Sequence, residues 1–213
     1  MTRKKINILT VRAVQDFLRE KNIQLFTPLD LERHFRVRTH TVLVFLVRNM
    51  KRGVYVQAKR GLYYDTQVVP SEMELANKLY QPSYLSFEYA LSHWGVIPET
   101  VYTITSVTTK ASREFVVNGV SFIYARMKPS VFTGYAAKEI QGRSVLMALP
   151  EKAFVDYLYF VDLKKKALYD RIDLHTLERD KVITWARIFR RPSLDALVRS
   201  VYDESRRTQE DSQ

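Results

Sequence analysis

Apolar side chains in the N-terminal part of the chain recur three or four positions apart, the spacing of one face of an α-helix. This pattern predicts a helix over residues 10–20, for which Thr10 is a suitable N-cap. A short apolar connection leads to a second predicted helix over residues 27–35. Thr27 can cap that helix, and Pro28 occupies the first turn, where a missing N–H costs nothing.

A third helix is predicted to begin at Thr39 or Thr41 and to continue to about Arg52. Gly53 can end it, because glycine accepts the left-handed conformation found at helix C-termini. Its expected inward face is wide and comprises Val42, Leu43, Leu46, Val47 and Met50. Residues 54–64 alternate as a β-hairpin does, with Lys59, Arg60 and Gly61 at the tip.

Three helices followed by a hairpin with a basic tip is the order of a winged helix-turn-helix. In that fold the third helix enters the major groove of DNA, and its N-terminal residues contact base edges. The hairpin, called the wing, lies on the neighbouring sugar-phosphate backbone. The sequence therefore predicts a DNA-binding domain over residues 1–68.

The remaining chain alternates between strand and helix patterns, which predicts an α+β domain over residues 69–207 and a polar tail over residues 208–213. A capping box formed by Ser71 and Glu74 precedes a linking helix. Asn118-Gly119 lies between alternating segments and predicts a tight hairpin. We expect an antiparallel sheet of four or five strands. The expected elements are a helix over 86–95 with Ser86 as its N-cap, strands over 101–109, 114–117, 120–127, 132–140 and 144–149, and helices from Pro150, over 173–190 and over 193–206.

Positive charge is concentrated at the N-terminal end. The formal net charge is +11. Residues 1–66 contain 14 Lys and Arg against 5 Asp and Glu, a net charge of +9, whereas residues 67–213 contain 20 against 18, a net charge of +2. Phosphate backbones attract such local basic density. Double-stranded DNA is therefore the expected partner.

The expected DNA contacts are the solvent-facing residues around the third helix and the wing. Arginine can donate two hydrogen bonds to guanine, and threonine can contact phosphate or a thymine methyl group. The candidates for the groove and its phosphates are Arg36, Arg38, Thr39, His40, Thr41 and Arg48, and those for the backbone beside the wing are Lys59 and Arg60. Alternatively, the unit binds protein, and Val44 and Phe45 are buried against a partner.

A second cluster of cations lies near the C-terminal end and comprises Lys164, Lys165, Lys166, Arg187, Arg190 and Arg191. It is either an extension of the DNA-binding surface or a site for an acidic partner. The alternative is an ordinary solvated face, which is the usual role of a charge run.

Five stretches, in this order, resemble the AbiEi-type antitoxins, a family described as transcriptional regulators of viral defence systems: residues 60–63, 84–91, 95–99, 101–108 and 149–153 followed by Asp156. The resemblance covers most of the chain. It implies a winged-helix domain joined to a domain that counteracts a nucleotidyltransferase toxin encoded beside it. It also implies repression of the protein's own operon through promoter repeats. A stand-alone regulator without a toxin partner is the alternative, and the oligomeric state, monomer or dimer, stays open.

No enzyme, cofactor or metal site is expected. The chain has no cysteine, and its four histidines lack ligand spacing. Glu151, Lys152 and Asp156 are expected to serve capping and surface pairing, because Glu151 and Asp156 do not share a helix face. Glu88 is expected to pair with Arg126 or Lys128. No apolar run is long enough for a membrane span, so a cytoplasmic location is the default expectation.

Overall fold

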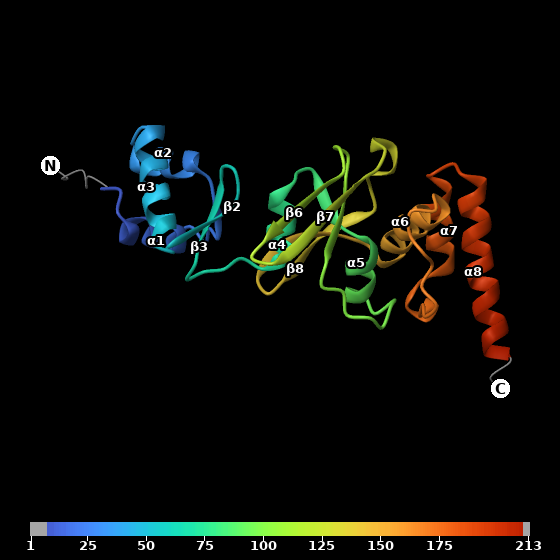
Figure 1. Ribbon diagram of the computed structural model, residues 1–213. Helices are drawn as coiled ribbons and strands as arrows, with labels where there is room; N and C mark the ends of the chain where they lie inside the picture. The colour runs from blue at the N-terminus through green and yellow to red at the C-terminus, as the bar shows by residue number, and fades with distance from the viewer. Residues whose placement is uncertain (1–7, 211–213) are drawn as a thin grey trace. The chain divides into compact units, whose positions relative to one another are not determined.

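The computed structural model describes residues 8–210 and divides the chain into two compact units, Met1–Leu79 and Tyr80–Gln213 (Figure 1). The sequence placed the domain boundary at residue 68. It falls later in the structure because α4, Glu72–Leu79, groups with the first unit. Ser71 accepts a hydrogen bond from the backbone N–H of Glu74 at the start of this helix, as expected.

The first unit contains the three predicted helices and the predicted hairpin. Thr10 accepts a hydrogen bond from the N–H of Ala13, and Thr27 forms a capping box with Asp30. A three-stranded antiparallel sheet has the order β1-β3-β2. The elements are α1 (Val11–Glu20), β1 (Leu25–Phe26), α2 (Pro28–Phe35), α3 (Thr39–Lys51), β2 (Tyr55–Lys59) and β3 (Leu62–Asp65). A connection was predicted in place of β1, because two residues are too few to show alternation.

The core of the first unit lies between its helices and the sheet. The fully buried side chains of Val14, Phe26, Leu31 and Val42 come from α1, β1, α2 and α3 respectively. Each such side chain stabilises the fold by roughly 1.5–3 kcal/mol. The expected inward face of α3 was wrong in part, since Leu43 and Val47 are exposed. The helix therefore has an apolar core face and a second apolar face in solvent.

The second unit is built on a six-stranded sheet of order β6-β7-β5-β4-β9-β8. The expectation of four or five antiparallel strands was wrong, because β4 pairs with β9 and β5 pairs with β7 in parallel. Strand β4 was not predicted, because it has only three residues and precedes a helix directly, which leaves no alternating pattern to detect. The strands are β4 (Ser83–Leu85), β5 (Ile104–Thr108), β6 (Arg113–Val117), β7 (Val120–Arg126), β8 (Tyr135–Ile140) and β9 (Arg143–Ala148). The Asn118-Gly119 hairpin between β6 and β7 is confirmed.

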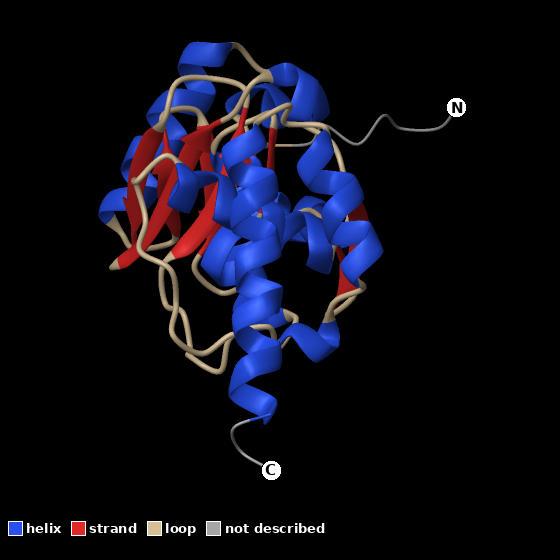
Figure 2. Cartoon of the chain, turned by 90° about the vertical axis from the view of Figure 1, so that its right-hand side faces the viewer, coloured by secondary structure: helices blue, strands red, loops and turns tan. Residues whose placement is uncertain are grey.

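Helices of the second unit follow the sheet in layers: α5 and α6 pack on it, and α7 and α8 pack on α6 (Figures 1 and 2). They are α5 (Phe87–His93), α6 (Pro150–Asp162), α7 (Arg179–Arg187) and α8 (Pro192–Glu210), with 3-10 turns η1 (Pro129–Val131) and η2 (Leu174–Thr176). The helix expected over 173–190 is thus η2 followed by α7. The expected tail at 208–213 was wrong as far as Glu210, and residues 211–213 lie outside the described residues. No helix among the described residues could cross a membrane.

Candidate nucleic-acid interface

Two arginines mark the sharp turn between α2 and α3. Arg36 ends α2 in the left-handed conformation, with φ 55°, and its backbone N–H donates to the carbonyl of Glu32 at 2.8 Å. Arg38 is the extended N-cap residue of α3. Both side chains are exposed. The turn therefore places two cations directly before the first residue of α3.

The first turn of α3 is electropositive. No side chain caps it, and it contains no acidic residue. The unpaired N–H groups at a helix N-terminus and the positive end of the helix dipole attract anions, phosphate among them. Thr39, His40 and Thr41 are exposed there, so hydroxyl and imidazole groups surround the same helix end.

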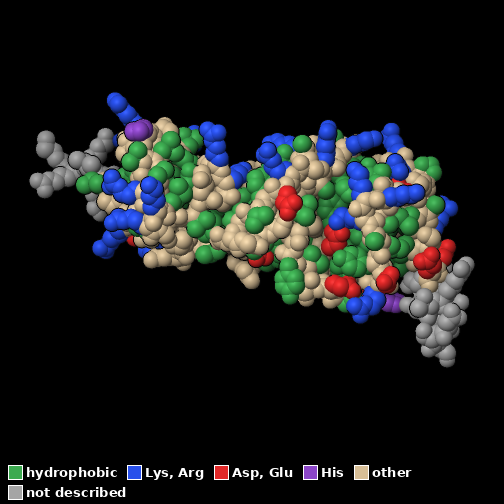
Figure 3. All heavy atoms as spheres, in the orientation of Figure 1, with side chains coloured by type: hydrophobic (Ala, Val, Ile, Leu, Met, Phe, Trp, Pro, Cys, Tyr) green, Lys and Arg blue, Asp and Glu red, His purple; other side chains and the backbone are tan. Residues whose placement is uncertain are grey.

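The exposed face of α3 continues as an aliphatic stripe with cations beside it. Leu43, Val44 and Val47 are 41%, 46% and 49% exposed. Together with His40, Arg48 and Lys51 they line a shallow depression of about 450 Å³. Hydrophobic side chains lying between Lys and Arg side chains are visible on the first unit in Figure 3. The ring of Phe45, in contrast, packs on the ring of Tyr55 within the unit, with 5.9 Å between the two ring centroids.

The β2–β3 turn provides one exposed cation rather than two. Arg60 is exposed, and Gly61 takes the φ of +80° that closes the turn. Lys59 is half-buried, and its ammonium group donates to the carbonyl of Leu79 at 2.7 Å. The sequence grouped Lys59 with Arg60 as a contact to DNA. In the structure its ammonium group is engaged with the end of α4 instead.

The remaining cations around α3 have no carboxylate partner. Among the side chains of residues 8–204, which the structure describes, none of the following forms an ion pair: Arg36, Arg38, Arg48, Lys51, Arg52 and Arg60. Unpaired cations keep their full attraction for an external polyanion. Lys51 and Arg52 were not among the predicted contacts, although the basic end of the predicted helix was a signal for them.

The second unit contains a buried polar cluster that joins α6 to the sheet. Lys152 and Asp156 have no exposed side-chain surface and form an ion pair. The Tyr84 hydroxyl donates to Asp156 Oδ2 at 3.0 Å and accepts from Lys152 Nζ at 3.1 Å. The Ser86 hydroxyl donates to the same carboxylate oxygen at 2.8 Å. The expectation of surface pairing was therefore wrong, and Ser86 does not cap α5 with its side chain as predicted.

Burial dominates the electrostatics of this cluster. It raises the pKa of Asp156, and the charge of Lys152 and the hydrogen bonds from Lys152, Ser86 and Tyr84 oppose that shift. Burial and the neighbouring Asp156 raise the pKa of the Tyr84 phenol far above its ordinary value. With no solvent-exposed surface on Lys152 or Asp156, a substrate cannot reach them in this structure. The cluster holds α6 against β4.

Close packing around Lys152 tightens this joint. A Cβ atom at Gly134, whose φ is +75°, would lie 2.8 Å from Lys152 Cγ and 2.9 Å from the Trp185 ring. Position 134 therefore excludes any side chain for both steric and conformational reasons. Glu151 is nearly buried as well, and accepts a hydrogen bond from the N–H of Glu178 at 3.4 Å.

Two of the six C-terminal cations are bound to carboxylates. Lys166 forms an ion pair with Glu88, so the expected partners of Glu88, Arg126 and Lys128, were wrong. Arg191 Nε lies 2.7 Å from Asp162 Oδ2, which brings the chain after α7 to the end of α6. The other four, which are exposed, are Lys164, Lys165, Arg187 and Arg190.

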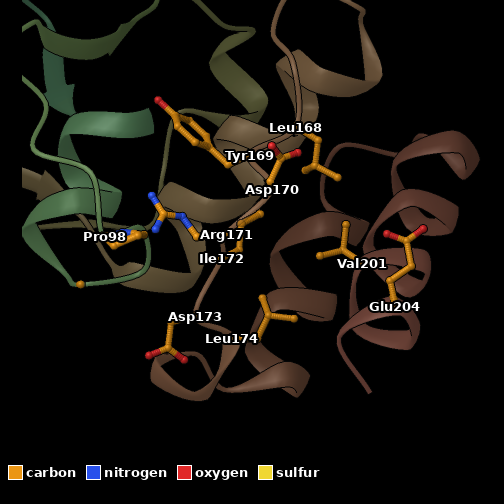
Figure 4. Close-up of a pocket in the computed structure, with 11 residues that line it drawn as sticks. Pro98, Leu168, Tyr169, Asp170, Arg171, Ile172, Asp173, Leu174, Val201 and Glu204 are labelled. Carbon is orange, nitrogen blue, oxygen red and sulfur yellow. The ribbon is translucent and has the colours of Figure 1, made fainter. Parts of the chain in front are cut away.

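A cavity of about 560 Å³ lies beside the segment between α6 and α7 (Figure 4). Tyr169, Asp170 and Arg171 contribute from this segment, and Val201 and Glu204 contribute from α8. The Arg171 guanidinium lies 3.1 Å from a Glu99 carboxylate oxygen. The lining mixes both signs of charge, and the described residues contain no cluster of three or more His, Asp or Glu suited to a metal ion.

Neither the protein-family models nor the curated proteins include a match to this chain. Of the eight predicted DNA contacts, seven are exposed, and six of these lie on or directly before α3: Arg36, Arg38, Thr39, His40, Thr41 and Arg48. Sequence reasoning missed the exposed aliphatic stripe, because Leu43 and Val47 have the spacing of core positions. It also missed the burial of the pair that Lys152 forms with Asp156, four positions further along the same helix face.

Proposed function

We propose that the first unit is a winged helix-turn-helix that binds double-stranded DNA and that the protein is a transcriptional regulator. α3 enters the major groove, and the β2–β3 turn lies on the adjacent backbone. The carrying observation is the set of exposed, unpaired cations around an uncapped helix N-terminus. A surface of this kind favours the phosphate backbone, which supplies most of the affinity in DNA binding.

Each exposed residue has a role that follows from its place. Arg36, Arg38 and the N-terminal N–H groups of α3 contact phosphate or guanine at the groove entrance. Arg48 follows along the groove, and Arg60 contacts the backbone from the turn. Lys59 is left out of the interface, because its ammonium group binds the carbonyl of Leu79.

For the whole chain, the resemblance to AbiEi-type antitoxins supports an autorepressor that also counteracts a nucleotidyltransferase toxin. Residues from two of the resembling stretches meet in the buried cluster, where Tyr84 and Ser86 bind Asp156. These stretches therefore share a structural role in the second unit. Co-expression with the adjacent gene product tests this part: restored growth supports antitoxin action, and unchanged toxicity contradicts it.

The test of DNA binding is the salt dependence of affinity. Binding of the full chain to duplex DNA, measured by fluorescence anisotropy, should weaken steeply with salt. The logarithm of the association constant should fall against the logarithm of the salt concentration with a slope of about −0.9 per phosphate neutralised. Arg60→Ala should reduce the magnitude of that slope by about 1. Arg171→Ala is the matched control, because this arginine is 76% exposed and lies in the second unit. Salt-independent binding would contradict the proposal.

A second candidate is a protein-binding unit with α3 as a dimer platform. The observation in its favour is the exposure of Leu43, Val44 and Val47. Native mass spectrometry separates the two: a stable dimer that dissociates on Leu43→Glu, with no affinity for DNA, would favour the second candidate.

A further inference from the structure

The solvent face of α3 lacks amide and carboxylate side chains, two of the kinds of group with which recognition helices hydrogen-bond to bases. Its only amide residue, Asn49, is 2% exposed and donates to the carbonyl of Phe45 at 2.8 Å. The helix contains no Gln, Asp or Glu. Beyond its first turn, the solvent-exposed residues are Leu43, Val44, Val47, Arg48 and Lys51. Amides recognise adenine and carboxylates recognise cytosine, so neither mode of recognition is open to this helix.

Only one group on the major-groove edge of a base pair is apolar, the C5-methyl group of thymine. We propose that α3 selects its DNA through thymine methyl groups packed against Leu43, Val44 and Val47. This inference rests on the proposed DNA binding and assigns its preferred sites: duplexes with thymines across the segment that faces the stripe.

The surroundings of the stripe favour a duplex over a protein as its occupant. Arg48 and Lys51 line the same depression, and Arg52 follows at the end of the helix. None of the three has a carboxylate partner among the described side chains of residues 8–204. An apolar surface bordered by free cations is complementary to methyl groups bordered by phosphates, the arrangement of a thymine-rich major groove.

The experiment compares duplexes that differ only in the methyl group. The full chain is titrated with poly(dA-dT) and with poly(dA-dU) at the same salt concentration. The backbone charge is equal, so loss of the methyl groups should weaken binding about fourfold for each methyl that the protein buries. Poly(dI-dC) with 5-methylcytosine should bind more tightly than the unmethylated polymer for the same reason.

Variants test whether the aliphatic stripe causes the preference for thymine. The double substitution of Val44→Thr and Val47→Thr keeps the side-chain shape, and should reduce the preference for poly(dA-dT) over poly(dA-dU) by at least half. Val69→Thr is the matched control, because Val69 is an aliphatic residue of the same unit that is 59% exposed and lies outside α3. The control should keep the full preference. Unchanged thermal midpoints would show that all variants are folded.

The outcomes separate this inference from the one on which it rests. Salt-dependent binding that is equal for the thymine and uracil duplexes would overturn methyl recognition and leave DNA binding standing. Absence of binding to every duplex would overturn both. A preference for thymine that survives the double substitution combined with Leu43→Ser would assign recognition to another surface. A dimer held together by the stripe would assign this face to a second copy of the chain.

Discussion

The cations around α3 in the first unit and three cations of the second unit have opposite roles. Around α3, arginine and lysine are exposed and lack carboxylate partners among the described residues. In the second unit, Lys152, Lys166 and Arg191 bind Asp156, Glu88 and Asp162. A cation held by a nearby carboxylate fixes one part of the chain to another, whereas a free cation is available to a partner. Charge counts alone do not separate these roles; the position of each carboxylate does.

The largest expected effect comes from removing one member of the buried pair. Lys152→Met should lower the free energy of unfolding of the second unit by about 3–5 kcal/mol, because it leaves Asp156 buried without its cation. Both tryptophans, Trp94 and Trp185, lie in this unit. Tryptophan fluorescence in urea therefore reports its unfolding.

The double substitution of Lys152→Met and Asp156→Leu is the control. Removing both charges should restore most of the lost stability, because an apolar pair needs no desolvation of ions. If the single and double variants are equally unstable, the ion pair is not what holds α6 on the sheet.

The next largest effect is the pH dependence of the stability that the buried Asp156 contributes. Because burial raises the pKa of Asp156 above 3.8, the folded chain holds this proton more tightly than the unfolded chain. The resulting stabilisation is complete below the unfolded pKa and is lost as pH rises through the folded pKa. Asp156→Asn removes this stabilisation. The unfolding free energy of the variant should therefore fall further below that of the wild type on acidification from pH 7, by at most about 1.4 kcal/mol per pH unit.

Urea unfolding at several pH values measures that deficit. Asp203→Asn, which changes an exposed acid on α8 to its amide, is the control variant measured alongside. A deficit of Asp156→Asn that shrinks on acidification would mean that the pKa is lowered rather than raised.

A smaller effect is expected from two matched arginines. Arg191→Ala should destabilise the second unit by about 1 kcal/mol, because it leaves the nearly buried Asp162 carboxylate without its partner. Arg38→Ala should change the unfolding free energy of the first unit by less than about 0.5 kcal/mol, and should weaken DNA binding instead. Calorimetry measures the stability of both variants, and fluorescence anisotropy measures their affinity for DNA. Equal destabilisation by the two substitutions would contradict the distinction between a structural arginine and a free one.

The smallest effect concerns salt and folding. Raising NaCl from 0.05 to 0.3 M should change the unfolding free energy of the second unit by less than about 0.5 kcal/mol, because buried pairs are hardly screened. The same change should weaken DNA binding by orders of magnitude. A second unit that loses stability in step with DNA affinity would show that its cations act through solvent-exposed charge.

Local signals in the sequence predicted much of the first unit, and tertiary contacts decided the rest. Thr10 and Thr27 cap their helices as expected, since a cap depends on residues three positions away. The exposure of Leu43 and Val47 depends on what packs across α3, which periodicity cannot reveal. The exposure of the six candidate residues on or before α3 followed from local order, whereas the hydrogen bond of Lys59 depends on Leu79, twenty residues away.

In the second unit, the hairpin at Asn118-Gly119 was predictable because its turn chemistry is contained in two residues. The central strand β4 was not, because its partners β5 and β9 come from later in the chain. The role of Ser86 changed for the same reason. Its hydroxyl meets Asp156, seventy residues away, instead of the backbone of its own helix.

The central position of β4 has a consequence for biosynthesis. Leu85 pairs with Met147 of β9, so the middle of this sheet cannot close before β9 has left the ribosome. The first unit ends at Leu79 and depends on no later strand for its own sheet. Domains fold as units during translation, N-terminal first. The nascent chain therefore presents a finished first unit while the second is still being synthesised.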